Sequence, residues 1–156
     1  MSPHQATLTL RSERDTKQLA LAVASEVRWG SEIGLSGDLG AGKTTFVRFL
    51  VGALGGSEAL VASPSFALQY EYELPNSRRL EHWDLYRLRE LPDELMEPPA
   101  DDTLRVIEWP EMAKGYLESL PLRIKLALSE GQERNVELDG VGGFKIAQLF
   151  TNWAVK

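Results

Sequence analysis

Residues 37–44 read G-D-L-G-A-G-K-T, and this stretch decides the fold. It matches the P-loop pattern G-x-x-x-x-G-K-[ST], in which a glycine-rich turn and the N-terminus of the next helix offer N–H groups to phosphate oxygens. In such a loop Lys43 reaches the β- and γ-phosphates, and the hydroxyl of Thr44 ligates Mg²⁺. The residues expected to bind the nucleotide are Asp38, Leu39, Gly40, Ala41, Gly42, Lys43, Thr44 and Thr45.

The segments on either side of the loop agree with this prediction. The partly apolar run 32–36 is expected to be a short strand, and residues 45–54 carry apolar side chains at helical spacing. Gly55 and Gly56 then end the helix. A turn that binds nothing is disfavoured, because the positive end of a helix repels a lysine unless an anion offsets the charge.

The rest of the chain predicts a mixed sheet. Two hairpin-like pairs of alternating runs, 66–73 with 79–86 and 122–129 with 133–138, indicate antiparallel strands beside the P-loop unit. We therefore expect an α/β protein with a P-loop NTPase-like three-layer fold, its mixed parallel and antiparallel sheet flanked by helices, in a single domain over residues 1–156. The other expected elements are strands 7–12 and 104–109 and helices 15–29, 110–120 and 144–153.

Composition restricts the class of function. The 156 residues carry a net charge of −6 and include no cysteine. No apolar run is long enough to span a membrane, and the N-terminus lacks the features of a secretion signal. We therefore expect a cytoplasmic protein. A protein that grips nucleic acid by itself usually carries a basic patch. If this chain serves nucleic-acid metabolism, a partner is expected to hold the nucleic acid.

Two acidic residues follow expected strands and could complete the chemistry. Asp84 follows residues 80–83 of one run, and Glu108 follows residues 104–107 of the more apolar one. Ligands of α/β sheets gather where parallel strands end, so both carboxylates could face the nucleotide, one on the metal and one on the attacking water. The alternative is that either acid is a solvated strand end or, for Glu108, the cap of a helix beginning at Pro110.

Several other polar side chains leave more than one role open. Ser63 and Ser65 could sense the γ-phosphate and the metal through a hydroxyl, or they could only set a turn. Trp109 could stack on a base or belong to the core. Arg134 could stabilise charge at the phosphates or lie on the surface of a strand. The side chains expected only to pack, half-buried, are those of His82 and Trp83.

Four sequence blocks, in this order, resemble one family. They are 37–46 (GDLGAGKTTF), 63–66 followed by 71–72, 82–88 (HWDLYRL) and 107–111 (IEWPE). The P-loop alone is generic, whereas the blocks around Asp84 and Glu108 at this spacing are highly specific. Together they resemble the bacterial TsaE family, also called YjeE, the small P-loop ATPases of tRNA threonylcarbamoyladenosine biosynthesis.

The resemblance implies a protein that binds ATP and Mg²⁺ and joins a TsaB–TsaD heterodimer. That assembly transfers a threonylcarbamoyl group to the adenosine at position 37 of certain tRNAs. ATP hydrolysis is implied to be slow without the partners and to serve turnover of the complex. The tRNA is implied to be held chiefly by the partners, and the free protein is expected to be a monomer with no membrane association.

The family's functional residues carry over to matching positions of this sequence. Lys43, Asp84 and Glu108 are implied to be catalytic, with Asp84 orienting the water and Glu108 on the metal, although these two roles could be exchanged. The metal ligands are implied to be Thr44, Glu108 and Ser65. The family usually has threonine at position 65, and the stretch 88–108 is shorter than usual, which bears on partner docking. Trp109 belongs to the same functional block.

Two other classes of protein share the P-loop. Small-molecule kinases need an arginine-bearing lid, and the region after Glu108 offers only Arg123 and Arg134. A nucleotide-gated assembly factor with negligible turnover would carry the same motifs as an ATPase. A GTPase is disfavoured because the chain has no N-K-x-D guanine-binding motif.

Overall fold

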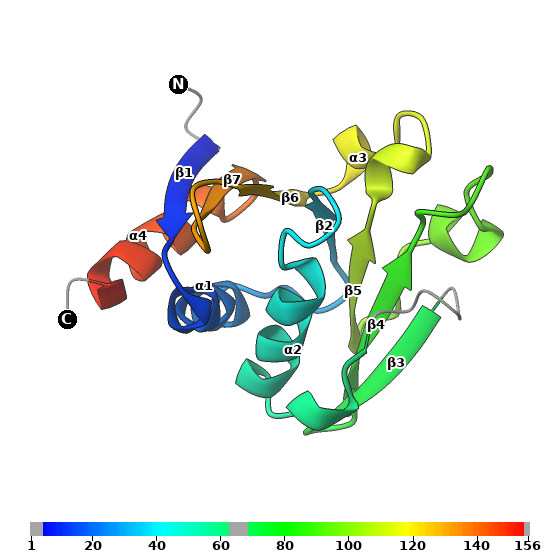
Figure 1. The fold of residues 1–156 in the computed structure, drawn as a ribbon. Helices are drawn as coiled ribbons and strands as arrows, with labels where there is room; N and C mark the ends of the chain where they lie inside the picture. The colour runs from blue at the N-terminus through cyan, green and yellow to red at the C-terminus, as the bar shows by residue number, and fades with distance from the viewer. Residues whose placement is uncertain (1–4, 63–68, 155–156) are drawn as a thin grey trace.

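The computed structural model describes residues 5–62 and 69–154, and within them one seven-stranded sheet has the order β1-β7-β6-β2-β5-β4-β3 (Figure 1). The parallel strands β6, β2, β5 and β4 form its centre, while β3 at one edge and β7 with β1 at the other are antiparallel to their neighbours. The predicted mixed sheet is therefore confirmed. The strands are β1 (Gln5–Leu10), β2 (Glu32–Ser36), β3 (Gln69–Leu74), β4 (Arg78–Asp84), β5 (Thr103–Glu108), β6 (Leu122–Leu128) and β7 (Arg134–Gly140).

The two faces of the sheet are covered unequally. The three longer helices α1 (Glu13–Ser25), α2 (Lys43–Ala53) and α4 (Gly143–Ala154) pack into the larger core, with α1 in contact with both α2 and α4. A smaller core on the other face lies under single turns, so the third layer is thin. These short elements are η2 (Asp93–Met96), η3 (Pro110–Met112) and α3 (Tyr116–Ser119), while a further turn, η1 (Glu58–Leu60), contacts α2.

Strand register brings the predicted site together. β5 lies between β2 and β4, and Glu108 at its end is paired with Leu35 on one side and Asp84 on the other. The P-loop begins directly after β2. The carboxyl ends of the three strands therefore meet at one edge of the sheet, as parallel topology requires.

The first helix begins earlier than predicted and is shorter. It spans Glu13–Ser25 rather than 15–29, with Ser12 as its N-cap. The N–H of Asp15 donates to the hydroxyl of Ser12 at 3.4 Å, and the carboxylate of Asp15 accepts from the N–H of Arg11 at 2.8 Å. Asp15 thus stabilises the first turn from inside the helix instead of preceding it.

The predicted helix 110–120 is wrong as a continuous element. Its residues form the single turn η3 and then the four-residue helix α3. The first turn ends at Ala113, which is extended, and Gly115, with a left-handed φ of +78°, is the N-cap of α3. Within the described part of the chain, no helix is both long and apolar enough to cross a lipid bilayer.

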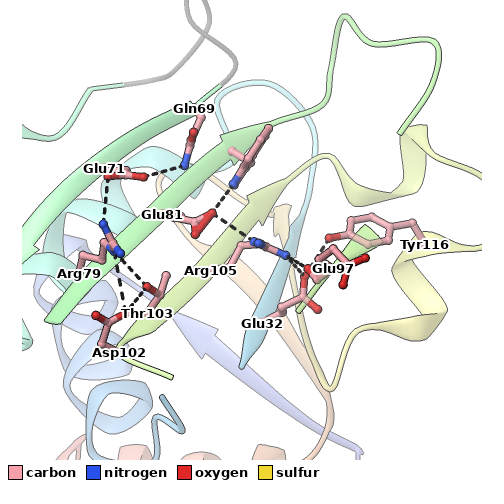
Figure 2. A network of polar contacts seen from close by, with 11 residues as sticks. Glu32, Gln69, Glu71, Arg79, Glu81, Glu97, Asp102, Thr103, Arg105 and Tyr116 are labelled. Atoms are coloured by element: carbon pink, nitrogen blue, oxygen red, sulfur yellow. Dashed lines mark hydrogen bonds and ion pairs between the residues drawn. The ribbon is translucent and has the colours of Figure 1, made fainter. Parts of the chain in front are cut away.

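A buried arginine links several strands on the face opposite α2 (Figure 2). Arg105 of β5 donates to the carboxylates of Glu32 in β2 at 3.2 Å and Glu81 in β4 at 3.3 Å. It also donates to the carbonyl oxygen of Glu97 at 2.8 Å, and the hydroxyl of Tyr116 donates to Glu32 at 3.0 Å. The network links β2, β5 and β4 to one another and to α3.

Candidate functional site

The P-loop connects β2 to α2, and two of its glycines serve different purposes. Gly37 has a φ of +146°, and a Cβ there would lie 2.3 Å from the carbonyl oxygen of Leu126 in β6. Gly42, with a φ of +103°, is the N-cap of α2, and no described atom lies within 4 Å of the place its Cβ would take. The loop is therefore fixed against the sheet and leaves the positive N-terminus of α2 accessible to an anion.

Lys43 is turned back onto the loop. Its ammonium group donates to the carbonyl oxygens of Gly37 and, at 3.1 Å, of Asp38. It also lies 4.3 Å from the centroid of the Trp109 ring, within the range of a cation–π contact. Burial lowers the pKa of Lys43, although the nearby carboxylate of Glu108 opposes this shift. The ammonium thus sits at the focus of the loop, held by main-chain oxygens.

Glu108 is a buried carboxylate with two side-chain partners. Glu108 is 3% exposed. Its Oε2 accepts a hydrogen bond from the Thr44 hydroxyl at 3.5 Å and also contacts Nε2 of His82. Residues 104, 106 and 108 alternate onto the α2 face of the sheet, which brings the end of β5 to the start of α2. A buried carboxylate is costly unless it is hydrogen-bonded, so these two contacts define its position. The carboxylate expected on the metal thus lies next to the hydroxyl of Thr44.

Asp84 lies beside Glu108 at the end of β4. The N–H of Tyr86 donates to its Oδ1 at 2.9 Å, which orients the carboxylate. Burial raises the pKa of Asp84 by desolvating its charged form, and the negative charge of Glu108 adds to this, while the hydrogen bond from Tyr86 opposes it. Asp84 is therefore an oriented carboxylate that binds a proton more readily than an exposed one.

Trp109 follows Glu108 in an unusual conformation. Its φ of +59° is left-handed, a region that a bulky side chain rarely adopts, and its N–H donates to the carbonyl oxygen of Leu35 at 3.1 Å. The ring lies 4.8 Å from that of Tyr86, centroid to centroid, at an interplanar angle of 45°. Trp109 is thus half-buried: it packs against the smaller core and lines the site next to Lys43.

Two pockets lie on either side of the P-loop and share Gly40, Gly42 and Thr45. The smaller has a volume of ≈ 330 Å³ and brings together Lys43, Thr44, Asp84 and Glu108, whereas Asp38 and Ala41 are not among the residues that line it. Leu39, Gly40, Gly42, Lys43, Thr44, Thr45, Asp84, Glu108 and Trp109 line it. The larger has a volume of ≈ 680 Å³ and lies between the loop, the start of α1 and the start of β7. Both volumes fall in the range typical of ligand sites.

The remaining candidates fall in different places. The side chain of Ala41 is buried, so only its backbone can serve a ligand. Arg134 donates to the carbonyl oxygens of Ala41 at 3.1 Å and Gly40 at 3.4 Å, which makes it a brace for the P-loop. Arg123 is paired with Asp139 at 3.0 Å. The hydroxyl candidates Ser63 and Ser65 lie outside the described residues.

The donor set fits a hard cation such as Mg²⁺. Within the described residues, no cluster of three or more His, Cys, Asp or Glu side chains could form a complete metal cage. A hydroxyl and a carboxylate do meet at the P-loop, and Mg²⁺ is usually bound by one or two carboxylates together with substrate phosphates and water. The carboxylates of Asp38, Asp84, Glu108 and Glu111 all act on the charge of Lys43. A triphosphate would meet this negative charge unless a divalent cation accompanied it.

Sequence reasoning assigned His82 to packing alone and missed its contact with Glu108. The structure gives His82 no exposed surface and places its ring against that carboxylate. The available signal was spacing: positions 82 and 84 of an alternating strand share a face, so a site containing Asp84 would also contain His82.

Comparisons with known proteins agree with one another. The family model described as "Threonylcarbamoyl adenosine biosynthesis protein TsaE" matches residues 10–136. The tRNA threonylcarbamoyladenosine biosynthesis protein TsaE of Rickettsia typhi is 33% identical over 130 residues, which cover 81% of this chain and 89% of that protein. Its namesake from Aquifex aeolicus is 41% identical over 106 residues, which cover 67% of this chain and 77% of that protein. The crystal structure of Bacillus subtilis YdiB covers 96% of both chains, with a TM-score of 0.68 and 25% identity.

The family match spans the P-loop, the buried His82 and both strand-end acids, Asp84 and Glu108. This chain belongs to the TsaE family.

Proposed function

We propose that this protein binds ATP with Mg²⁺ and hydrolyses it slowly in the biosynthesis of N6-threonylcarbamoyladenosine at position 37 of tRNA. Family membership and the names of its relatives support the pathway. One observation carries the chemistry: the ammonium of Lys43, the hydroxyl of Thr44 and the carboxylates of Asp84 and Glu108 line one pocket beside the P-loop. These are the groups that phosphoryl transfer from a nucleotide to water requires.

The two acids suit different roles. Glu108 holds the metal with Thr44, because the two side chains are already in contact and the carboxylate is buried. Ser65 remains a third candidate ligand outside the described residues. When bound, Mg²⁺ neutralises charge on the triphosphate oxygens. Asp84 orients the attacking water and accepts its proton, a role that its raised pKa and its fixed carboxylate support.

The nucleoside belongs in the larger pocket. That pocket shares its P-loop wall with the phosphate pocket, so a nucleotide whose γ-phosphate points toward Glu108 can continue across Gly40 and Thr45 into it. The guanidinium of Arg134 lies at this junction and keeps the loop in shape. In this arrangement Arg134 supports the loop and does not contact the transferred phosphate.

The partners are a TsaB–TsaD heterodimer, with the ATPase cycle driving turnover of the complex in the cytoplasm. The net charge of −6 supports an indirect contact with tRNA, because an acidic chain does not attract a polyanion. The free protein is a monomer. Its turnover is expected to rise when the partners are added.

The experiment measures phosphate release from ATP by the purified protein, alone and with TsaB and TsaD. Lys43→Ala should lose ATP binding, whereas Asp84→Asn should bind ATP and hydrolyse it about 10²–10⁴-fold more slowly, as loss of a general base predicts. Lys145→Ala, on the exposed face of α4, is the control and should behave as wild type.

Two outcomes would contradict the proposal. If Asp84→Asn supports full tRNA modification while its hydrolysis is abolished, the protein is a nucleotide-gated assembly factor and turnover is dispensable. If phosphate is released only when a metabolite with a free hydroxyl is supplied, and the partners have no effect, the protein is a kinase.

A further inference from the structure

His82 is completely buried and lies between two polar side chains. In β4, its Nε2 contacts Oε2 of Glu108, and its Nδ1 lies 3.5 Å from the hydroxyl of Tyr72 in β3. The hydroxyl of Tyr72 also lies 3.4 Å from both the N–H and the carbonyl oxygen of Ala62. A line of polar groups therefore runs from the backbone after η1 to the carboxylate at the end of β5.

The hydrogen-bonding capacities of these groups determine the direction of the line. An ionised carboxylate only accepts, so Nε2 of His82 must carry the hydrogen that faces Glu108. In the neutral imidazole Nδ1 is then an acceptor, and the Tyr72 hydroxyl is its donor. The oxygen of Tyr72 accepts in turn from the N–H of Ala62. In this direction each donor, from the N–H of Ala62 to Nε2 of His82, points toward Glu108, and the single hydrogen of the Tyr72 hydroxyl goes to Nδ1 rather than to the carbonyl oxygen of Ala62.

A residue that only filled space would not need this arrangement. Glu108 has three rotatable bonds, and its contact with Thr44 at 3.5 Å is at the long limit of a hydrogen bond, so that contact alone leaves the carboxylate weakly held. The ring of His82 comes from the strand next to β5 and approaches the same oxygen, Oε2, that Thr44 contacts. The two contacts together fix one rotamer of the carboxylate at the start of α2.

We propose that His82 is a positioning residue that orients Glu108 toward the metal bound at Thr44, with Tyr72 fixing the tautomer of the imidazole. This inference rests on the proposed function, because it assumes that Glu108 ligates Mg²⁺. Groups that hydrogen-bond to metal ligands fix their orientation, and their loss typically lowers metal affinity or activity about 10–100-fold. His82 itself touches neither the nucleotide nor the metal.

Two conservative variants separate positioning from packing. The side-chain amide nitrogen of glutamine lies as many bonds from the backbone as Nε2 of histidine, so His82→Gln keeps a donor for Glu108. The amide of asparagine corresponds to Nδ1, so His82→Asn keeps a polar group near Tyr72 but does not reach Glu108. Calorimetry then measures the affinity of each variant for a non-hydrolysable ATP analogue, once in EDTA and once in saturating Mg²⁺.

The readout is the factor by which Mg²⁺ strengthens binding of the analogue. We expect this factor to fall about 10–100-fold in His82→Asn and to stay near the wild-type value in His82→Gln. Binding in EDTA should be unchanged in both variants. Tyr72→Phe should reduce the factor about fivefold, the effect of losing one hydrogen bond, and it decides the question if His82→Asn does not fold.

Three results would overturn the inference. His82→Asn could keep the wild-type factor, both variants could lose the factor equally, or binding in EDTA could fall together with the melting temperature, as a purely structural role predicts. A wild-type protein that binds no analogue at all would refute the proposed function as well. A wild-type protein that binds with a clear Mg²⁺ effect, left intact in His82→Asn and Tyr72→Phe, would refute only the role of His82.

Discussion

Replacing Arg105 by methionine is expected to destabilise the fold by about 3 kcal/mol. The arginine side chain is 5% exposed and is the shared partner of Glu32 and Glu81, whose side chains are 19% and 13% exposed. Methionine retains the apolar stem but removes the charge, so two largely buried carboxylates lose their cation. Figure 2 shows how both carboxylates converge on the guanidinium.

The magnitude follows from what remains after the substitution. Breaking a buried ion pair by removing one partner costs about 3–5 kcal/mol. Glu32 keeps its hydrogen bond from Tyr116 at 3.0 Å, and Glu81 keeps the one from Trp83 at 3.0 Å, so the lower end applies. For a domain of this size each kcal/mol lowers the melting temperature by about 2–4 °C, which gives a loss of about 6–12 °C.

Arg79 is the matched control because it is an arginine in the neighbouring strand with weaker pairs. Its side chain is 45% exposed, and its distances to Glu71 and Asp102 are 3.8 and 3.9 Å. Exposed pairs contribute about 0–1 kcal/mol, so Arg79→Met should shift the melting temperature little. Urea unfolding followed by circular dichroism measures both variants. Equal losses, or a loss below about 1 kcal/mol for Arg105→Met, would refute the reasoning.

Two further predictions concern the site. The pKa of Asp84 is raised in the folded state, so ionisation of its carboxylate destabilises the folded protein as the pH rises through that pKa. Asp84→Asn removes this ionisable group and should therefore have a higher melting temperature than wild type at pH 7. The difference in melting temperature should disappear below a pH of about 4, where the carboxyl is protonated in both the folded and the unfolded state. Melting curves across this range check the sign, and an advantage that grew in acid would contradict it. Gly37→Ala should lower the free energy of unfolding by about 3 kcal/mol, because the new Cβ would lie 2.3 Å from a backbone oxygen. Gly40→Ala should lower it by about 1–2 kcal/mol, because the φ of Gly40 is +80° but no described atom lies within 4 Å of the new Cβ. Urea unfolding of the two variants tests this difference, and equal costs would show that contact with β6 does not constrain the loop.

The parts of the fold that the sequence predicted are those fixed by neighbouring residues. The P-loop, its helix and the two hairpins depend on turn residues and on alternation within a few positions, and all of them are present. The prediction of one helix from Pro110 was wrong. Proline and the apolar residues after it favour a helix locally, but Tyr116 and Leu120 are buried in the smaller core by a chain that forms two separate short turns. Tertiary packing outweighs a weak local preference.

The candidate site, too, could be predicted from the sequence only in part. Asp84 and Glu108 were predicted to meet because strands of a parallel sheet end together, which requires no knowledge of side-chain contacts. Glu108 contacts Thr44, which lies 64 positions away in the sequence, and His82, which lies 26 positions away. The local sequence pattern around these residues does not specify either contact. Arg134, predicted to be a charge-stabilising finger or a surface charge, contacts the P-loop backbone across 93 positions. Partners this distant follow from the order of strands in the sheet.

The hydrogen bonds of Lys43 to the carbonyl oxygens of Gly37 and Asp38 make the P-loop a competitor for its own lysine. Any anion that draws the ammonium outward must first break these bonds and the contact with Trp109. The observed affinity for a nucleotide then equals the intrinsic affinity multiplied by the fraction of molecules in which Lys43 is already released. A protein that docks against Trp109 and displaces its ring could raise that fraction, and so tighten nucleotide binding without touching the nucleotide.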